Sequence, residues 1–341
     1  MQTSKQANSN TEIRVLSYNI CWGCMLGNKR GLFNSTAKAL AEKCIKPRTN
    51  KSSGGSDRSC LQTVADHIDN ASPDHPLDFV GTQESANWEK LQRSSRVLRK
   101  MTAVHHLTSN GIVHLATFYN HLRWQLDAVK VGDLIHTAPG SNKPETGRPY
   151  HILYLTERDN LRNKYIVINI HNGHQGGADR LIRNLSADPD SAMMHIAGGK
   201  ELDTKKESAI YRQVIAGQKF RVIMMGDFND SDKDQYYKGL RPFAKSGISE
   251  LKALRVSSQG VKPPRTCCTP SRGTSHIRRG LGIQAKPERN GDYILISDGL
   301  EYVKPTHTPT GSGLDYDARV SPASDHLPVM AVIRTIPFTQ N

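Results

Sequence analysis

The amino-acid sequence predicts a mixed α/β fold built as one domain. Short stretches rich in β-branched and aromatic residues recur along the chain, and fewer stretches place apolar residues at helical spacing. No internal repeat and no strong linker divides the 341 residues, and single α/β units often exceed about 200 residues. We therefore predict a disordered polar lead over residues 1–11 and one domain over residues 12–338.

The first elements follow from these patterns in order. Residues 13–18, IRVLSY, alternate apolar and polar side chains, which predicts a half-buried strand. Residues 29–58 are basic and rich in Ser, Gly and Asn, which predicts a flexible surface loop. A helix ending near Asn70 is predicted by apolar residues at helical spacing, namely Leu61, Val64, Ala65 and Ile68.

The rest of the chain alternates between apolar stretches and polar loops. A second helix is predicted over residues 206–217. Several strands with few helices between them favour a mixed sheet system. These strands are predicted at residues 77–85, 111–119, 150–156, 164–170, 220–225, 292–297 and 327–333.

The charge of the chain is strongly positive. There are 46 Lys and Arg residues against 32 Asp and Glu residues, a formal net charge of +14. This balance favours polyanionic partners, nucleic acid first and an anionic membrane surface second. No stretch approaches the roughly 18 to 20 apolar residues of a membrane span, and residues 1–10 lack the apolar core of a signal peptide. We therefore expect an intracellular protein, cytoplasmic or nuclear, with no transmembrane segment.

The six cysteines are too few to make a chain of this length a disulfide scaffold, so we expect reduced thiols. Cys21 and Cys24 have the spacing of a redox or zinc motif. No second Cys/His pair with ligand spacing follows them, and this favours structural thiols over a zinc or redox site.

Acids, amides and histidines cluster where predicted strands end or begin. Taken singly, each is an ordinary loop residue or helix N-cap. Their recurrence favours a functional site, because loops at the ends of rigid sheets often carry function. The residues are Asn19, Gln83, Glu84, His171, Asn172, His174, Asp227, Asn229, Asp230, Asp292, Asp325 and His326.

These residue types suit metal-dependent phosphoester hydrolysis. The carboxylate of Glu84 and the amide of Asn19 are hard oxygen ligands of the kind that Mg2+ or Mn2+ prefers. A histidine can accept a proton near neutral pH, and a carboxylate beside it can fix its tautomer and stabilise its charged form. Metal, base and orienting group together meet the needs of phosphoester hydrolysis.

The motifs SYN, TQE, IHN, GDFN, DYIL and SDHLPV, in this order, resemble those of the endonuclease/exonuclease/phosphatase superfamily. This superfamily of metal-dependent phosphodiesterases includes deoxyribonuclease-I-like nucleases. The matches run from Asn19 to Val329 and so cover nearly the whole chain. The resemblance implies a four-layer sandwich of two mixed, mainly antiparallel β-sheets flanked by helices, with the active site at one edge.

The resemblance also implies roles for the matched residues. Asn19, Glu84 and Asp325 would bind Mg2+ (or Mn2+), as one ion or two. Asp227 and Asn229 would orient the attacking water and a phosphate oxygen.

The histidines complete the implied site. His171 would contact the scissile phosphate, and His326, oriented by Asp292, would act as base or stabilise the transition state. The chain departs from the pattern at Gly291, where many relatives carry a larger residue, and at Asp230, where the inositol-polyphosphate 5-phosphatase branch usually has Arg. The signature of the abasic-site endonuclease branch has no clear counterpart.

A basic segment precedes Asp292. Residues 255–289 contain eight Lys and Arg residues and one acid, and few aromatic residues that could stack on bases. The segment is expected either to track a phosphate backbone or to be a solvated loop. The expected substrate-binding residues are Asn172, Arg265, Arg272, Arg278 and Arg279.

Three functions stay open from the sequence. The leading one is a Mg2+-dependent nuclease, endonuclease or exonuclease, acting on DNA or RNA. The second is a phosphatase or phosphodiesterase of small or lipid phosphoesters, such as inositol phosphates or sphingomyelin. The third is an inactive polyanion-binding module, which the complete set of motif residues disfavours. No protein partner is evident.

Overall fold

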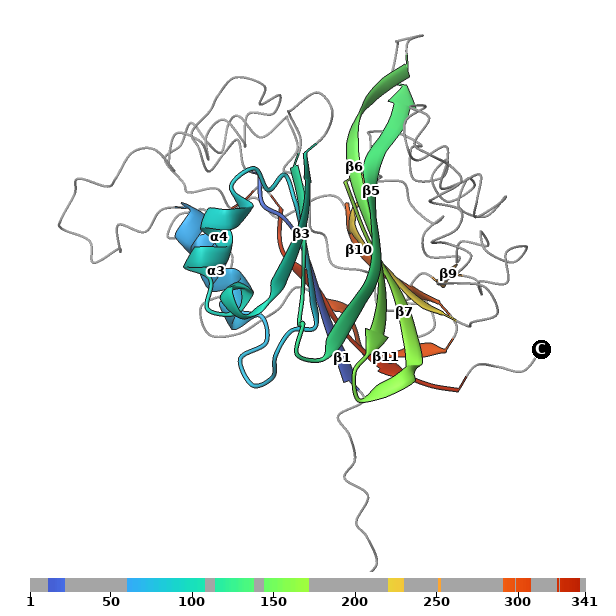
Figure 1. Cartoon of the computed structure of the whole chain (residues 1–341). Helices are drawn as coiled ribbons and strands as arrows, with labels where there is room; N and C mark the ends of the chain where they lie inside the picture. Colours follow the sequence, from blue (N-terminus) through green and yellow to red (C-terminus); the bar gives the residue numbers. More distant parts are fainter. Residues whose placement is uncertain are drawn as a thin grey trace, which may run out of the picture.

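In a computed structural model of the chain, two six-stranded β-sheets lie face to face (Figure 1). This arrangement confirms the predicted sandwich. The helix predicted over residues 206–217 lies outside the described part of the chain, and the described helices all lie on the first sheet. The structure describes residues 12–21, 60–107, 114–137, 144–171, 220–229, 251–252, 291–297, 299–307, 324 and 326–337.

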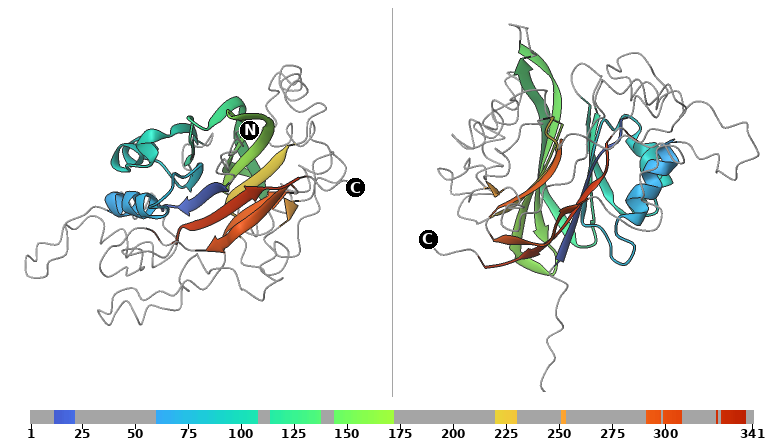
Figure 2. Two further views of the ribbon diagram at one scale, coloured as in Figure 1. Left: turned by 90° about the horizontal axis from the view of Figure 1, so that it is seen from below. Right: turned by 180° about the vertical axis from the view of Figure 1, so that it is seen from behind.

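The first sheet has the strand order β11-β12-β1-β2-β4-β3. Its strands are β1 (Glu12–Asn19), β2 (Phe79–Gln83), β3 (Thr102–Leu107), β4 (His114–Tyr119), β11 (Leu300–His307) and β12 (Val329–Thr335). Strand β1 pairs in parallel with β2 and antiparallel with β12. Elements from the two ends of the chain therefore lie side by side in this sheet (Figure 2).

The second sheet has the strand order β5-β6-β7-β8-β10-β9. Its strands are β5 (Trp124–Thr137), β6 (Pro144–Glu157), β7 (Asn160–His171), β8 (Arg221–Asp227), β9 (Leu251–Lys252) and β10 (Asp292–Ser297). Strands β7 and β8 are parallel, whereas β8 and β10 are antiparallel. The site-bearing ends of β7 and β8 therefore lie beside the start of β10.

Helices cover the outer face of the first sheet (Figures 1 and 2). They are α3 (Cys60–Asn70), α4 (Trp88–Ser94) and the 3-10 helix η1 (Leu98–Lys100). Val64 and Ile68 of α3 belong to the same buried cluster as Leu16 and Tyr18 of β1, which confirms the helix predicted from apolar spacing. No helix in the described ranges is long and apolar enough to cross a membrane.

Strand β1 is buried on both faces, although its alternation predicted a half-buried strand. Ile13 and Val15 pack between the two sheets, while Leu16 packs under the helices. The polar Ser17 is fully buried and Arg14 is 8% exposed. Arg14 reaches this position because its guanidinium pairs with Glu12 at 2.6 Å, so a polar residue in the alternation did not mean a solvated face.

Several elements were not predicted from the sequence. Strand β3 contains the adjacent His105 and His106, and edge strand β5 carries Asp127, Lys130 and Gly132. These residues obscure the apolar alternation that identifies a strand. Strand β11 and helix α4 were missed as well, so the apolar pattern identified mainly the central strands.

The expectation of reduced thiols was wrong for two cysteines. Cys21 and Cys60 are disulfide-bonded, and no free cysteine occurs in the described ranges. The number of cysteines in a sequence does not tell which of them meet in space, so the low count was misleading. Disulfides persist mainly in oxidising compartments. The disulfide therefore does not support the intracellular location, which stays a prediction.

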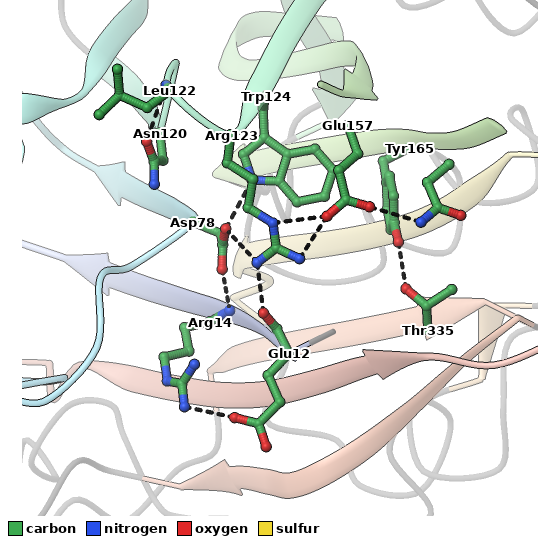
Figure 3. Close-up of polar contacts among 11 residues, drawn as sticks. Glu12, Arg14, Asp78, Asn120, Leu122, Arg123, Trp124, Glu157, Tyr165 and Thr335 are labelled. Carbon is green, nitrogen blue, oxygen red and sulfur yellow. Dashed lines mark hydrogen bonds and ion pairs between the residues drawn. The ribbon is translucent and has the colours of Figure 1, made fainter. Parts of the chain in front are cut away.

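A polar cluster joins the two sheets at the end of the strands opposite to Asn19 (Figure 3). Asp78 accepts hydrogen bonds from the backbone N–H of Arg14 at 2.8 Å and from Nε1 of Trp124 at 2.9 Å. Its Oδ1 also pairs with Nη1 of Arg123 at 3.0 Å. Since Arg14 lies in β1 and Trp124 begins β5, Asp78 connects the two sheets directly.

Replacing Asp78 by Ala is expected to lower the free energy of unfolding by about 3 kcal/mol, because buried donors of Arg14 and Trp124 lose their acceptor. Urea denaturation followed by tryptophan fluorescence measures this loss. Glu301→Ala is the control, since Glu301 pairs with Arg334 where both side chains are exposed, and its loss should stay below about 1 kcal/mol. Equal losses would contradict the role of Asp78.

Candidate active site

The strand ends that carry the predicted site residues meet at one end of the sandwich. His171 is paired with Asp227, and Asp227 is paired with Asp292 on the next strand. In the other sheet, Asn19 is paired with Gln83. Side chains alternate between the faces of a strand, so Asn19, His171 and Asp227 continue the rows that face the space between the sheets.

Asn19 connects the two sheets at this end. Its Nδ2 donates to Oδ2 of Asp227 at 2.8 Å, although the two residues are 208 positions apart. The same nitrogen lies 3.5 Å from Oε1 of Glu84. Asn19 and Asp227 are each 1% exposed, so this contact fixes the relative position of two residues that solvent does not screen.

Turns following the strands hold these side chains in place. The backbone N–H of Cys21 donates to Oδ1 of Asn19 at 3.1 Å, and the backbone N–H of Asn229 donates to Oδ1 of Asp227 at 2.8 Å. Both are Asx turns, in which a side chain accepts from the backbone two residues later. Cys21 and Asn229 have φ values of 46° and 50°, in the left-handed region that non-glycine residues rarely adopt.

Two more residues at these strand ends depend on unusual backbone angles. Glu84, directly after β2, has a φ of 54°. Gly226 has a φ of 148°, and a Cβ there would lie 2.0 Å from the carbonyl oxygen of Ile170. No other residue fits at Gly226 while β8 stays paired with β7, which explains the glycine of the GDFN motif.

His326 is held by a carboxylate. Its Nδ1 lies 2.9 Å from Oδ2 of Asp292, and its Nε2 lies 3.9 Å from Oδ2 of Asp227. The carboxylate can only accept, so the Nδ1–H of His326 donates to Asp292. Ser324 supports the pair, because its Oγ accepts from the backbone N–H of His326 at 3.1 Å and donates to the carbonyl oxygen of Asn19 at 2.7 Å.

An arginine that the sequence analysis missed reaches the site. Nη1 of Arg148 lies 2.7 Å from Nε2 of His171, and that nitrogen lies 3.7 Å from Oδ2 of Asp227 and 3.9 Å from Oε1 of Glu84. Arg148 lies in β6, which is antiparallel to β7. Its place shortly before the apolar stretch 150–156 is the signal that could have identified it.

The site can hold a divalent cation by the chemistry of its donors. Asp227, Asp292 and His326 each offer a ligand atom, and these atoms lie within 4.8 Å of one another. The Glu84 carboxylate adds a hard oxygen donor from the other sheet. Asn19 turns its Nδ2 toward Glu84 and Asp227, while its amide oxygen accepts from the backbone N–H of Cys21. This donor set is richer in oxygen than in nitrogen, which suits Mg2+ or Mn2+ better than Zn2+.

Burial raises the pKa of the Asp227 carboxyl from 3.8 to about 6. His326 and the hydrogen bond from Asn19 oppose this increase, whereas the nearby Asp292 adds to it. A carboxyl with this pKa can exchange a proton close to neutral pH.

The structure brings together six of the residues identified from the sequence: Asn19, Glu84, His171, Asp227, Asp292 and His326. Asn229 lies next to them through its bond to Asp227. The remaining candidates lie outside the described residues, and their placement stays a prediction. They are Asp325, Asn172, Arg265, Arg272, Arg278 and Arg279.

Comparison with known sequences gives little functional information. No family model matches the chain. The uncharacterized protein L684 of Acanthamoeba polyphaga mimivirus is 26% identical over 326 residues, which cover 94% of this chain and 50% of the relative. The chain therefore spans about half the length of this curated relative.

Solved structures share the fold of the chain. An endonuclease/exonuclease/phosphatase family protein of Bacteroides thetaiotaomicron is 15% identical, with a TM-score of 0.54 over 97% of this chain and 98% of that one. The human Nocturnin catalytic domain with bound sulfate is 14% identical, with a TM-score of 0.52 and 97% of both chains covered. A mannosyl-6-phosphatase of B. thetaiotaomicron is 15% identical, with a TM-score of 0.50 over 94% of this chain and 99% of that one.

The chain thus has the fold of the endonuclease/exonuclease/phosphatase structures, which confirms at the level of the fold the resemblance found in the motifs. At these identities the likeness defines the fold, and the chemistry must be argued from the site.

The pKa of Asp227 makes the metal-free protein sensitive to pH. Between pH 4 and 6 the folded protein retains a proton on this carboxyl that the unfolded chain has lost. The stability contributed by Asp227 is therefore lost as pH rises through this window. Measured in EDTA, the unfolding free energy of Asp227→Asn minus that of the wild type is expected to increase by roughly 3 kcal/mol from pH 4 to 7. A difference that is constant with pH would contradict the assignment.

Proposed function

We propose that the chain is a Mg2+-dependent phosphodiesterase that hydrolyses phosphodiester bonds in nucleic acid. The observation that carries the proposal is the convergence of Asn19, His171 and His326 on the carboxylate of Asp227, within 2.8 to 3.9 Å. Core packing does not require one amide and two imidazoles around a buried acid, whereas phosphoester hydrolysis uses such a set. The shared fold with Nocturnin and other phosphoesterase structures supports the proposal.

In this proposal Glu84 binds the cation together with Asp325, and Asn19, predicted from the sequence as a ligand, supports Glu84 through its Nδ2. When bound, the cation supplies Lewis-acid polarisation of the phosphate and neutralises charge. Glu84 suits this role because its side chain is 30% exposed, so one side remains open to a substrate. The competing donor group of Asp227, Asp292 and His326 is more buried and better suited to proton transfer.

The protein groups divide the remaining work. His326 donates its Nδ1–H to Asp292, so Nε2, on the side of Asp227, is the nitrogen that would take a proton or stabilise developing charge. Asp227, with its raised pKa, would orient or deprotonate the attacking water. Arg148, which donates to Nε2 of His171, would also donate to a non-bridging oxygen of the phosphate, and His171 would contact the scissile phosphate.

The preference for nucleic acid rests on charge. A net charge of +14 raises the local concentration of a polyanion, and the arginines of residues 255–289 are proposed to contact its backbone, with Asn172 near the phosphate. A small phosphoester is the second candidate, favoured by the shared fold of a mannosyl-6-phosphatase. Such a substrate would not need the long basic segment. An inactive polyanion-binding module is the third.

The proposal is tested with one panel of substrates. Labelled single- and double-stranded DNA and RNA are compared with inositol phosphates, a sugar 6-phosphate and sphingomyelin, each with Mg2+, Mn2+ or EDTA. We expect metal-dependent cleavage of nucleic acid, which falls by at least about 100-fold in Glu84→Gln and His326→Gln because ligand and proton-transfer groups are lost.

The control variant for the panel is Glu89→Gln, an exposed acid in the first turn of α4, which should cleave like the wild type. Equal turnover in EDTA would contradict the metal-dependent mechanism. Activity confined to the small phosphoesters would overturn the preference for nucleic acid while retaining the phosphoesterase, and binding of nucleic acid without any cleavage would favour the inactive module.

Arg148 gives a separate prediction. Arg148→Met is expected to lower kcat/KM for a reporter such as bis(p-nitrophenyl) phosphate by about 100-fold, because a positioned donor to the transition state is lost. Added guanidinium should restore part of the activity. Arg158→Met is the control, since this exposed arginine bonds the backbone of His121 away from the site. Full activity in Arg148→Met would remove Arg148 from the proposed mechanism.

A further inference from the structure

A buried layer of polar side chains lies between the two sheets directly beneath the candidate site. Its members face the inter-sheet space in five different strands, and each is 0% exposed. They are Ser17 in β1, Gln83 in β2, Thr117 in β4, His151 in β6 and Asn169 in β7. Apolar residues of both sheets form the core further from the site, so the layer separates the core from the site.

The layer is a continuous chain of hydrogen bonds. Nε2 of Gln83 lies 3.2 Å from Oγ of Ser17 and 2.8 Å from Oδ1 of Asn169. Nδ2 of Asn169 donates to Oγ1 of Thr117 at 3.0 Å, and Thr117 in turn bonds Nδ1 of His151 at 2.8 Å. Gln83 and Asn169 thus connect strands of opposite sheets.

The backbone makes room for this contact. A Cβ on Gly81 would lie 2.9 Å from Cγ and Oδ1 of Asn169, so a larger residue would push the amide away from Gln83. Nδ2 of Asn169 also bonds the carbonyl oxygen of Ala116 at 3.0 Å. Asn169 of the second sheet is therefore fixed against β2 and β4 of the first sheet.

Stability alone does not explain the layer. Oε1 of Gln83 and Nε2 of His151 are buried and have no hydrogen-bond partner among the described residues. Each such atom is destabilising, and an apolar layer of the same shape would hold the sheets at least as firmly. An apolar layer would lack directional contacts, whereas a satisfied hydrogen bond between the sheets fixes how far one strand is displaced along another.

Three residues of the layer stand one or two positions before residues of the site. Ser17 precedes Asn19 by two positions, Asn169 precedes His171 by two, and Gln83 is followed by Glu84. We infer that Gln83 and Asn169 are positioning residues: their inter-sheet hydrogen bond sets the axial alignment of β1, β2 and β7, and so the meeting of Asn19, Glu84 and His171. The inference rests on the proposed phosphoesterase activity.

The test replaces both polar partners by apolar residues of similar shape, in the double variant Gln83→Met/Asn169→Leu. The inference predicts that kcat for bis(p-nitrophenyl) phosphate falls at least tenfold with KM little changed, since a small misalignment of catalytic groups acts on the transition state. The urea midpoint is expected to stay the same or rise. A merely structural pair would leave kcat unchanged in a variant that remains folded.

Two further variants keep the test decisive if the double variant fails to fold. Thr117→Val removes the hydroxyl at constant shape and should lower kcat. Thr117→Ser keeps the hydroxyl and should have a kcat close to that of the wild type. Met225→Leu is the matched control, because Met225 is paired with Asn169 in the next strand and packs in the apolar cluster between the sheets. Its kcat should equal that of the wild type.

The outcomes separate the two proposals. No hydrolysis of either nucleic acid or the reporter by the wild type would refute the proposed function itself. An active wild type together with unchanged kcat in the double variant, or in Thr117→Val where the double variant is unfolded, would refute the positioning role and leave the proposed function intact. An equal loss of kcat in Met225→Leu would also refute it, because any repacking of the layer would then suffice.

Discussion

The hydrogen bond between Asn19 and Asp227 is the constraint on which the candidate site depends. It joins the last residue of a strand in one sheet to the last residue of a strand in the other, at 2.8 Å and with both groups buried. Neither sheet holds the site alone, because Glu84 comes from the first sheet and His171 from the second. The chemistry therefore requires that strand ends of two separately hydrogen-bonded sheets lie at the same position along the strand direction.

Three levels of contact between the sheets meet this requirement. Asp78 fixes the far end through Arg14, Arg123 and Trp124. The apolar cluster in the middle holds the sheets together without specifying their displacement along the strands, since the hydrophobic effect is non-directional. Directional bonds between the sheets also occur at the site, in the layer of Gln83 and Asn169 and then in Asn19 itself. Polar groups at both ends of the apolar core thus align the two sheets along the strand direction.

The sequence predicted the fold, and it singled out residues that the structure brings together, because strand periodicity and strand ends are local features. Glu84, Asp227 and Asp292 each stand at an apolar stretch, where the pattern is readable. Arg148 could not be found this way, since its contact with His171 arises from the pairing of β6 with β7. The prediction of a reduced thiol at Cys21 was wrong for the same reason, because Cys21 is disulfide-bonded. Features that depend on which strands become neighbours are not encoded in any short segment.

The acids of the site show why a cation and a proton compete there. Asp227 lies close to Asp292 and is fully buried, and in the metal-free protein its raised pKa relieves the repulsion between two negative charges by retaining a proton. A divalent cation near Glu84 and Asn19 would provide the same compensation, and ligand deprotonation would then accompany binding. The positive charge of the chain as a whole cannot do this, because distant surface charges are screened within about 10 Å. In the metal-free protein the compensating charge at short range comes from His326, and in the proposed mechanism a cation would add to it.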